Sequence, residues 1–339
     1  MTVTRHDDLK DVANESDWFA TIMIPTPSNL DDARARFELE WRNARRQLSD
    51  VWDDDELEQL DELVGSLRHG DSTSLVIVHA HHGSTLIEAL DEPVSATTVH
   101  EGPLPRWLTV IEARQRVIAH VVVEADRAGA DLTAFDGGNV LAIESVDGAT
   151  VHIHRGHPGG WSQHRFQQRA ENTWEDNARQ AADAVATLAR KVDAQLIAVA
   201  GDIRAQVFIL ESLPADIADI TVRIDAGSPA GIADEVVRLL STIVAERVTT
   251  AADLVRAGLN NDIASIDTNT IVAALRRGRV DTLLVHDDAT SGHAADPNRL
   301  DGARLVDRAI VAALATDAEI LVVPRLAMMH GPLAATLRW

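Results

Sequence analysis

The stretch ENTWEDNARQAADAVATLARKVDAQLIAVA, residues 171–200, decides the fold class. Its apolar residues recur every three or four positions, which predicts a helix with one apolar stripe over 171–194. The stripe consists of Trp174, Ala178, Ala181, Val185, Leu188 and Val192. A short apolar run over Leu196–Ala200 predicts a buried strand, and a strand over Ile220–Ile224 and a helix over Gly231–Val248 follow it. This alternation predicts a partly parallel sheet with helical crossovers, in a mixed α/β fold.

The residues before this stretch predict further strands. Four short strands with Gly-containing turns between them suggest an antiparallel meander. They are Val117–Glu124, Ala130–Phe135, Val140–Ser145 and Thr150–His154. The first ~100 residues also have an α/β pattern, with strands at Phe19–Ile24, Leu75–His79 and Thr85–Leu90 and helices at Asp31–Leu48 and Asp54–Leu67. The C-terminal part has another, with helices at Ile271–Arg277 and Ala303–Ala315 and strands at Val280–His286 and Glu319–Val323.

Two aperiodic segments suggest domain boundaries. Residues 91–106 contain three prolines and no regular pattern, and Asn260–Asn269 is polar and rich in Asn and Asp. They predict three domains, at 1–105, 106–262 and 263–339.

Composition narrows the classes of function. The chain has 339 residues, a net charge of -22 and no cysteine. The missing cysteine excludes disulfides, iron–sulfur clusters and thiol catalysis. We expect a cytoplasmic protein, because the N-terminus lacks an apolar signal region and no apolar run reaches the ~18 residues of a membrane span. The overall charge repels nucleic acid and anionic membranes, so we expect no DNA or membrane partner, and any RNA contact must come from a local basic segment.

Such a segment exists. Residues 148–170, GATVHIHRGHPGGWSQHRFQQRA, contain no Asp or Glu, where the chain average would place about three or four. We name residues 148–170 the acid-free segment. His157-Pro158-Gly159-Gly160 suggests a flexible tip, and Arg165 and Arg169 would lie on one face of the helix that follows. RNA contact is one interpretation, and a Gly-rich connector with solvated arginines is the other.

Other residue groups predict no site. His79, His81 and His82 suggest a metal site together with His152 and His154, but no carboxylate partner is evident in the sequence, so no metal is expected. The acidic run at 53–56 is interpreted as the solvated N-terminus of a helix. No cofactor motif is present, and none is expected.

The string GGWSQHRFQQR, residues 159–169, resembles the GGQ loop of archaeal and eukaryotic class-1 release factors, the Pelota-like family. Gly159, Gly160, Ser162, Arg165, Phe166 and Arg169 match its pattern, whereas Trp161 stands where the family has its catalytic glutamine. The bacterial relatives of this lineage, which include the ribosome hibernation factor Balon and mycobacterial proteins, resemble the chain more closely. The resemblance extends over about residues 117–339 and includes ALRRGRVDTLLV at 274–285 and AATLRW at 334–339.

The resemblance implies a three-domain, release-factor-like architecture. It would have a divergent N-terminal α/β domain, a middle domain with the GGQ-like loop and a small C-terminal α/β/α domain that binds a translational GTPase. The implied partners are the 70S ribosome, at the 23S rRNA near the peptidyl-transferase centre, and elongation factor Tu with GTP or GDP. The residues expected to contact rRNA are Arg155, His157, Gly159, Gly160, Trp161, Ser162, Gln163, His164, Arg165 and Arg169.

The departure at Trp161 decides the expected activity. An indole has one N–H donor and no acceptor, so it cannot orient a water as an amide does, but it can stack on a base. We therefore expect a hibernation factor that occupies the ribosomal A site under stress, inhibits translation and is not an enzyme. One alternative is a peptidyl-tRNA hydrolase or rescue factor that uses Gln163. Another is an RNA-binding or scaffold protein that does not bind the ribosome.

Overall fold

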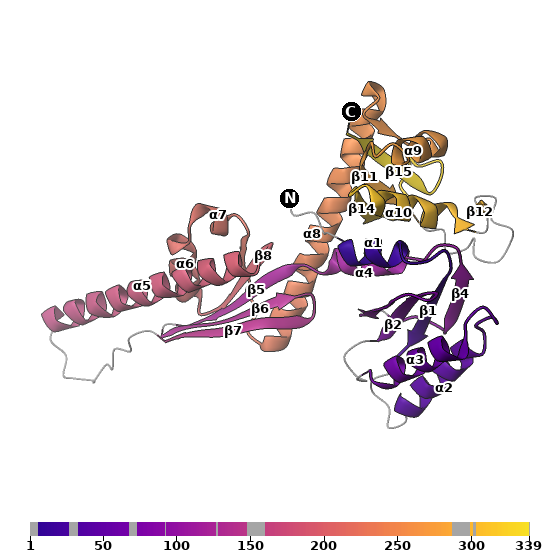
Figure 1. Ribbon diagram of the computed structural model, residues 1–339. Coiled ribbons are helices and arrows are strands. Elements are labelled where there is room, and N and C mark those ends of the chain that lie inside the picture. Colours follow the sequence, from indigo (N-terminus) through magenta and orange to yellow (C-terminus); the bar gives the residue numbers. More distant parts are fainter. Residues whose placement is uncertain are drawn as a thin grey trace. The chain divides into compact units, whose positions relative to one another are not determined.

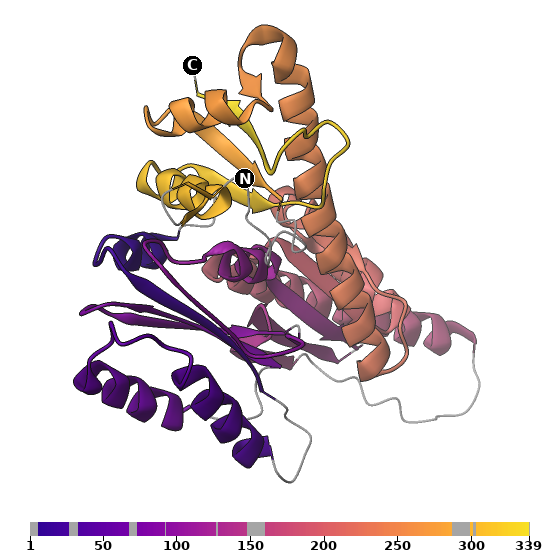
Figure 2. The same ribbon diagram turned by 90° about the vertical axis from the view of Figure 1, so that its right-hand side faces the viewer.

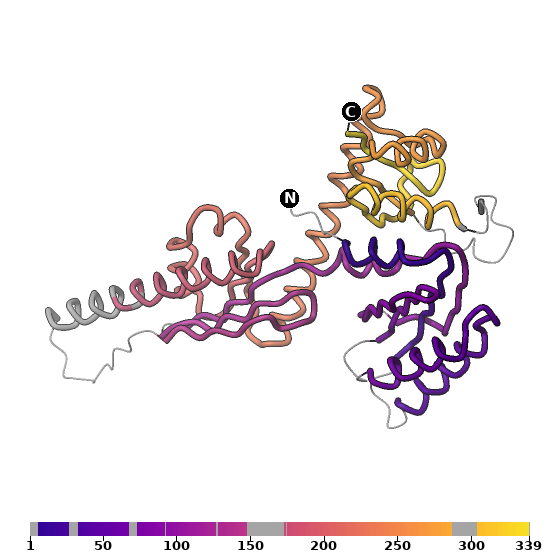
Figure 3. Tube along the Cα trace, in the orientation of Figure 1, coloured from indigo at the N-terminus to yellow at the C-terminus, as the bar shows by residue number. Residues whose placement is uncertain are grey.

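The computed structural model describes residues 6–26, 33–67, 73–91, 93–126, 128–147, 160–286, 299–300 and 303–338. They form two compact units, which are best followed by colour in Figures 1 and 3. Unit 1 comprises residues 1–115 and 246–339, and unit 2 comprises residues 116–245. Both units combine helices with sheets, which confirms the mixed α/β class. The division into domains 1–105, 106–262 and 263–339 stays a prediction.

The N-terminal sheet of unit 1 is antiparallel throughout and has the order β3-β2-β1-β4. Its strands are β1 (Phe19–Pro25), β2 (Ser74–Ala80), β3 (Thr85–Leu90) and β4 (Thr98–Gly102). Side chains alternate between the two faces of a strand. Ile22 and Ile77 therefore pack with helices α2 (Ala33–Arg45) and α3 (Asp54–Gly65), and Phe19 and Val78 pack in the cluster that contains α1 (Asp7–Ala13) and α4 (Leu108–Arg116). Figure 2 shows α2 and α3 together on one side of this sheet.

The C-terminal sheet of unit 1 is mixed and has the order β10-β15-β11-β14. Its strands are β10 (Ala264–Ser265), β11 (Val280–Val285), β14 (Glu319–Val322) and β15 (Leu333–Leu337). Leu283 faces α9 (Thr268–Leu275) and α10 (Leu305–Ala315), while Leu284 packs with Val255 of α8 (Pro229–Gly258). The expected α/β/α layering is present, but one of its helical layers is α8, which lies before the expected C-terminal part 263–339. Three short elements complete the unit: η1 (Leu259–Asn261), β12 (Arg299–Leu300) and β13 (Ala303–Arg304).

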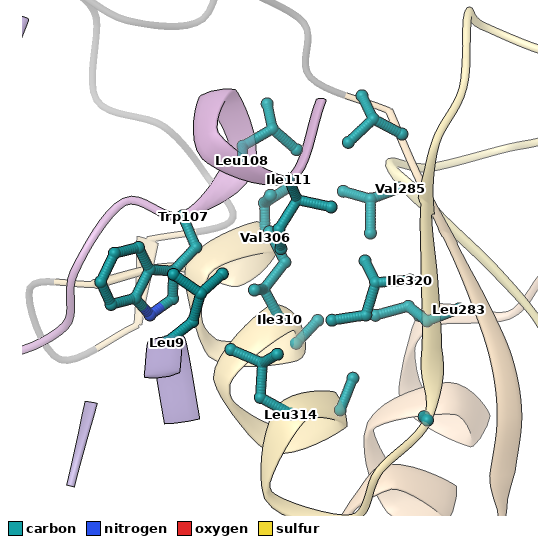
Figure 4. Packing of buried hydrophobic residues seen from close by; sticks show 14 of the residues in the cluster. Leu9, Trp107, Leu108, Ile111, Leu283, Val285, Val306, Ile310, Leu314 and Ile320 are labelled. Carbon is teal, nitrogen blue, oxygen red and sulfur yellow. The ribbon is translucent and has the colours of Figure 1, made fainter. Parts of the chain in front are cut away.

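One hydrophobic core joins the N-terminal and C-terminal parts of unit 1. Leu9 of α1 and Trp107 beside α4 pack in the same buried cluster as Ile310 and Leu314 of α10 (Figure 4). Gln115 adds polar contacts, since its side-chain amide donates to the Val322 carbonyl at 3.0 Å and accepts from the Val322 N–H at 2.9 Å. Segments from both ends of the chain thus share one folding unit.

Unit 2 is built on a five-stranded sheet with the order β7-β6-β5-β8-β9. Its strands are β5 (Ala119–Ala125), β6 (Gly129–Asp136), β7 (Asn139–Asp147), β8 (Leu196–Gly201) and β9 (Thr221–Arg223). The pairs β5–β6 and β6–β7 are antiparallel, whereas β5–β8 and β8–β9 are parallel, which confirms both the meander and the partly parallel sheet. Helices α5 (Gly160–Lys191), α6 (Ile203–Ser212) and α7 (Ala215–Ala218) contribute to the core on one face, and the first half of α8 packs in a separate cluster with β8.

The structure corrects three expectations. Residues 98–102 form β4 inside the segment expected to be an aperiodic boundary. The expected linker Asn260–Asn269 contains β10, which forms because it pairs with β15. Helix α5 begins at Gly160, eleven residues before the expected start at 171. The expected strand Thr150–His154 lies outside the described residues. None of the helices in the described ranges has the length and apolar character needed to span a bilayer.

Candidate functional site

The acid-free segment begins directly after β7 of unit 2 and includes the first residues of α5. Strand β7 ends at Asp147, and α5 begins at Gly160. Among the expected RNA-contacting residues, Arg155, His157 and Gly159 lie outside the described residues. Gly160 is the first residue of α5, and Trp161, Ser162, Gln163, His164, Arg165 and Arg169 follow it along the helix. Because the side chains of these last six lie outside the described part of the chain, their RNA-binding role stays a prediction.

The length of α5 changes the expected geometry of the tip. The helix has 32 residues, which corresponds to about 48 Å at 1.5 Å per residue. Gly160 belongs to this helix and not to a flexible tip, which corrects the expectation for that residue. Arg165 and Arg169 are four positions apart on the same helix, which is the spacing expected from the sequence.

Packing on the sheet holds the second half of α5 in place. Ala181, Val185 and Leu188 are buried among the apolar side chains of β5 and β6. The small residues of the stripe allow the helix to lie close to the sheet, and Leu188 fills the space near its end. The expected apolar stripe is thus confirmed at Ala178, Ala181, Val185 and Leu188. The sheet therefore fixes the helix whose first turns belong to the acid-free segment.

Charge divides α5 into two parts. In its described second half, Arg179 pairs with Asp176 at 2.7 Å and Arg190 pairs with Asp216 of α7 at 2.9 Å. Arg190 lowers the pKa of the Asp216 carboxyl through these hydrogen bonds. In the first half, Arg165 and Arg169 belong to a run of 23 residues without an acidic side chain. Arginines of the second half are partly neutralised by acids, whereas the sequence has no acid three or four positions from either arginine of the first.

A second group of polar residues assembles in unit 1, where β2 meets the N-terminus of α3. Asp53 caps α3: its carboxylate accepts from the Glu56 N–H at 2.8 Å, and the Glu56 carboxylate accepts from the Asp53 N–H at 3.2 Å. Glu56 is only 6% exposed. A carboxylate with so little exposure needs polar partners. Its partners come from the end of β2 and the turn after it.

Three histidines surround the Glu56 carboxylate. The Nδ1 atom of His81 lies 3.1 Å from both carboxylate oxygens. Oε1 lies 3.6 Å from Nε2 of His79 and 3.6 Å from Nδ1 of His82. The His82 backbone N–H also donates to Oε1 at 2.5 Å. One carboxylate thus has an imidazole nitrogen from each of three neighbouring histidines within 3.6 Å. We call Glu56, His79, His81 and His82 the histidine cluster.

Aromatic packing and hydrogen bonds hold this cluster. The Trp52 ring lies 5.2 Å from the ring of His79 and 5.3 Å from that of His81, measured between centroids. Burial favours the protonated form of Glu56, but backbone hydrogen bonds from His82 and Asp53 and the nearby His81 lower the pKa of its carboxyl. Burial also lowers the pKa of the His79 imidazole, against the attraction of Glu56. The cluster therefore favours an ionised carboxylate beside a neutral His79.

The cluster corrects two interpretations of the sequence. The acidic run does begin a helix, but Glu56 is buried and not solvated. It is also the carboxylate partner that the sequence did not reveal for the histidines. Glu56 lies 25 residues before His81 and on a different element, so local spacing gave no sign of their contact. The spacing of Asp53 and Glu56, an acid followed three residues later by Glu at a helix start, is a capping-box signal that pointed to a back-folded Glu56 side chain.

Comparison with known proteins finds a family match in the middle of the chain. Residues 119–261 match bacterial archaeo-eukaryotic release factor family 2. This stretch runs from β5 to η1 and includes the acid-free segment. Residues 119–261 are thus similar to the bacterial archaeo-eukaryotic release factors, which confirms the resemblance for this part of the chain. The closer likeness to Balon stays a prediction.

Individual proteins are similar over longer stretches. The "uncharacterized" proteins MT2704 and Rv2629 come from the Mycobacterium tuberculosis strains CDC 1551 / Oshkosh and ATCC 25618 / H37Rv. Each is 27% identical over an alignment of 285 residues, and the match covers 79% of this chain and 74% of theirs. Among solved structures, Archaeoglobus fulgidus Pelota is 16% identical with a TM-score of 0.39. Saccharomyces cerevisiae Dom34 is 12% identical with a TM-score of 0.43. Each alignment covers 78% of this chain and 79% of the other.

Proposed function

We propose that this protein binds the 70S ribosome and silences translation without hydrolysing peptidyl-tRNA. The acid-free segment would enter the A site and place residues 157–163 near the peptidyl-transferase centre of the 23S rRNA. One observation carries the proposal. The region matched to a release factor family, residues 119–261, contains a 23-residue run without acids in a chain of net charge -22. Local positive charge in an acidic protein is what selective contact with RNA phosphates requires.

The fold of unit 2 supports this role mechanically. The sheet holds α5 through the buried stripe that includes Val185 and Leu188. The first half of the same helix carries Arg165 and Arg169, and the acid-free residues before it begin after Asp147 of β7. An anchored helix presents such residues at less entropic cost than a free loop does. The sheet would act as a base from which the segment reaches rRNA.

Trp161 supports inhibition over catalysis. Hydrolysis of a peptidyl ester needs groups that orient water and stabilise the developing negative charge. An indole provides neither an acceptor nor a second donor, but its ring stacks on a nucleobase with roughly 1–3 kcal/mol. The segment would occupy the catalytic centre and block it. Elongation factor Tu, with GTP or GDP, would deliver the protein through its C-terminal part.

Co-sedimentation of the full chain with 70S ribosomes tests the proposal, at about 50 and about 200 mM salt and with or without elongation factor Tu. We expect pelleting at low salt that weakens at high salt. The double variant Arg165→Glu/Arg169→Glu should lose it, and Arg179→Glu/Arg190→Glu, the same charge change on the described half of α5, should retain it. No pelleting, or equal loss in both double variants, would contradict the proposal.

Release of the peptide from ribosome-bound peptidyl-tRNA separates the inhibitor from the alternative enzyme. The wild-type chain should release none, and Trp161→Gln should create activity if the segment already lies at the reacting ester. If the wild-type chain hydrolyses the ester and Gln163→Ala abolishes this, the protein is a hydrolase that uses Gln163.

A further inference from the structure

We propose that the histidine cluster of unit 1 is a binding site for a divalent transition metal ion of the Zn²⁺ class, with Glu56, His81 and His82 as ligands. The inference is independent of the proposed function, since it concerns a different unit and different residues. The three side chains each offer one ligand atom, and these atoms all lie within 4.8 Å of one another. Two imidazoles and a carboxylate are a donor set that zinc uses with a fourth, open position.

The distances fit a metal of this size. Tetrahedral Zn²⁺ with bonds of about 2.0–2.1 Å holds its ligand atoms about 3.3 Å apart. Nδ1 of His81 lies 3.1 Å from Oε1 of Glu56, and Nδ1 of His82 lies 3.6 Å from the same oxygen. The His81 and His82 rings stack with 3.8 Å between their centroids, so both nitrogens are already directed at one carboxylate. Little movement would be needed to enclose an ion.

A buried, unpartnered nitrogen supplies a second and independent observation. His79 is 3% exposed, and its Nε2 has no hydrogen-bond partner among the described residues. This Nε2 atom lies 3.6 Å from Oε1 of Glu56. Its other nitrogen, Nδ1, lies 2.9 Å from Thr85 Oγ1, which fixes the orientation of the ring. A buried polar atom without a partner is costly, and this one lies beside the carboxylate that would hold the ion, although His79 is not among the three ligands.

The residues around the cluster leave it accessible to an ion from solvent. Trp52, which is buried, covers His79 and His81 and lowers the polarity behind the site. The side chain of His82 is 66% exposed, and its Nδ1 lies 3.9 Å from an Asp53 oxygen that is also accessible. An ion can thus enter past His82, and a water or Asp53 can take the fourth position.

Isothermal titration of the metal-stripped full chain with Zn²⁺ tests the site, with Co²⁺ absorption as a report of tetrahedral coordination. We expect the wild-type chain to bind one equivalent of Zn²⁺ tightly. The variants His81→Asn and His82→Asn should each bind it at least about 100-fold more weakly, because loss of a partner outside the ligand shell already lowers metal affinity by about 10–100-fold. Asn suits position 82 because His82 has a left-handed backbone with φ 55°. The control His330→Asn, at another exposed histidine of unit 1, should bind as the wild type does.

The histidines of the acid-free segment provide the decisive comparison, because they offer imidazoles elsewhere in the chain. His152→Asn/His154→Asn should leave the tight equivalent unchanged. If that double variant removes it, while His81→Asn and His82→Asn do not, the ion binds outside the cluster and the proposal is overturned. Absence of any tight equivalent would overturn it as well. Thermal unfolding of each variant without metal verifies that the variant is folded.

Discussion

The acid-free segment and the histidine cluster are two different kinds of candidate site. Composition reveals the first, since 23 consecutive residues without acids stand out in a chain of net charge -22. Folding reveals the second, since Glu56 and the histidines meet only when α3 packs beside β2. A site that attracts a large polyanion needs net local charge. A site that holds one small ion needs a few donors at fixed distances. The two units therefore offer separate sites that separate variants can test.

The largest expected effect is on the anchoring of α5. Leu188→Ala removes a fully buried side chain from the core of unit 2, and we expect a loss of about 2–5 kcal/mol in the free energy of unfolding. Urea unfolding measures it. The affinity for the ribosome should fall as the stability of unit 2 falls, whereas Zn²⁺ binding in unit 1 should not change. Leu254→Ala, at a side chain that is 56% exposed, is the matched control, with an expected change within ±0.5 kcal/mol. Equal losses in both variants would contradict the packing described for α5.

The next effect concerns the architecture of the histidine cluster. Glu56→Ala leaves the backbone N–H groups of Asp53 and His82 without their carboxylate acceptor, and we expect a loss of about 1–3 kcal/mol. Urea unfolding in the presence of a chelator measures this without metal. Glu58→Ala, on the exposed face of the same helix, should change little. If the two variants are equally stable, Glu56 does not connect α3 to β2.

A pH effect is expected in unit 2. Burial lowers the pKa of His120, a 4%-exposed histidine whose ring stacks on Phe135. The unfolded chain, with a histidine pKa of about 6.5, binds this proton more readily than the folded protein does. Stability should therefore fall as the pH drops below about 6.5 toward the lowered native pKa. His120→Gln should flatten that part of the profile of unfolding free energy against pH. An unchanged slope in the variant would show that His120 does not contribute.

The smallest effect is expected at the exposed ion pairs of α5. Arg179→Ala breaks the pair with Asp176, in which both side chains are more than 60% exposed. Such a pair contributes about 0.2–1 kcal/mol or less, and salt weakens it. Neither stability nor ribosome binding should change measurably. A large loss of ribosome binding would indicate that RNA contacts the second half of α5 and not the acid-free segment.

Local pattern predicted most of the elements. The strand at 85–90 and the stripe of α5 were expected where they occur, because hydrophobic period 2 or 3.6 is set by the residues themselves. Strand β4, with the sequence TVHEG, was missed because all its residues are half-buried and no alternation of polar and apolar residues marks it. Strand β10 was missed because pairing with β15, and not its own sequence, makes it a strand.

The two candidate sites also differ in whether local sequence or tertiary structure reveals them. The arginines of the acid-free segment are found by reading the sequence, and helix α5 confirms that Arg165 and Arg169 lie on one helix. The histidine cluster needed tertiary structure, because the carboxylate that completes it belongs to the buried side of an acidic run. Reading the acids at 53–56 as one solvated group hid the residue that turns inward. An acid followed three residues later by Glu at the start of a helix is the sequence signal of a Glu side chain that folds back toward the N-cap.

The placement of the acid-free segment on the ribosome is the central claim, and directed hydroxyl-radical probing tests it most directly. Because the chain has no cysteine, Ser162→Cys provides a single attachment point for an iron chelate, and Ser241→Cys on the exposed side of α8 is the control. We predict cleavage of 23S rRNA around the peptidyl-transferase centre from position 162 and a different pattern from position 241. Cleavage confined to other regions, or identical patterns from both positions, would contradict the account.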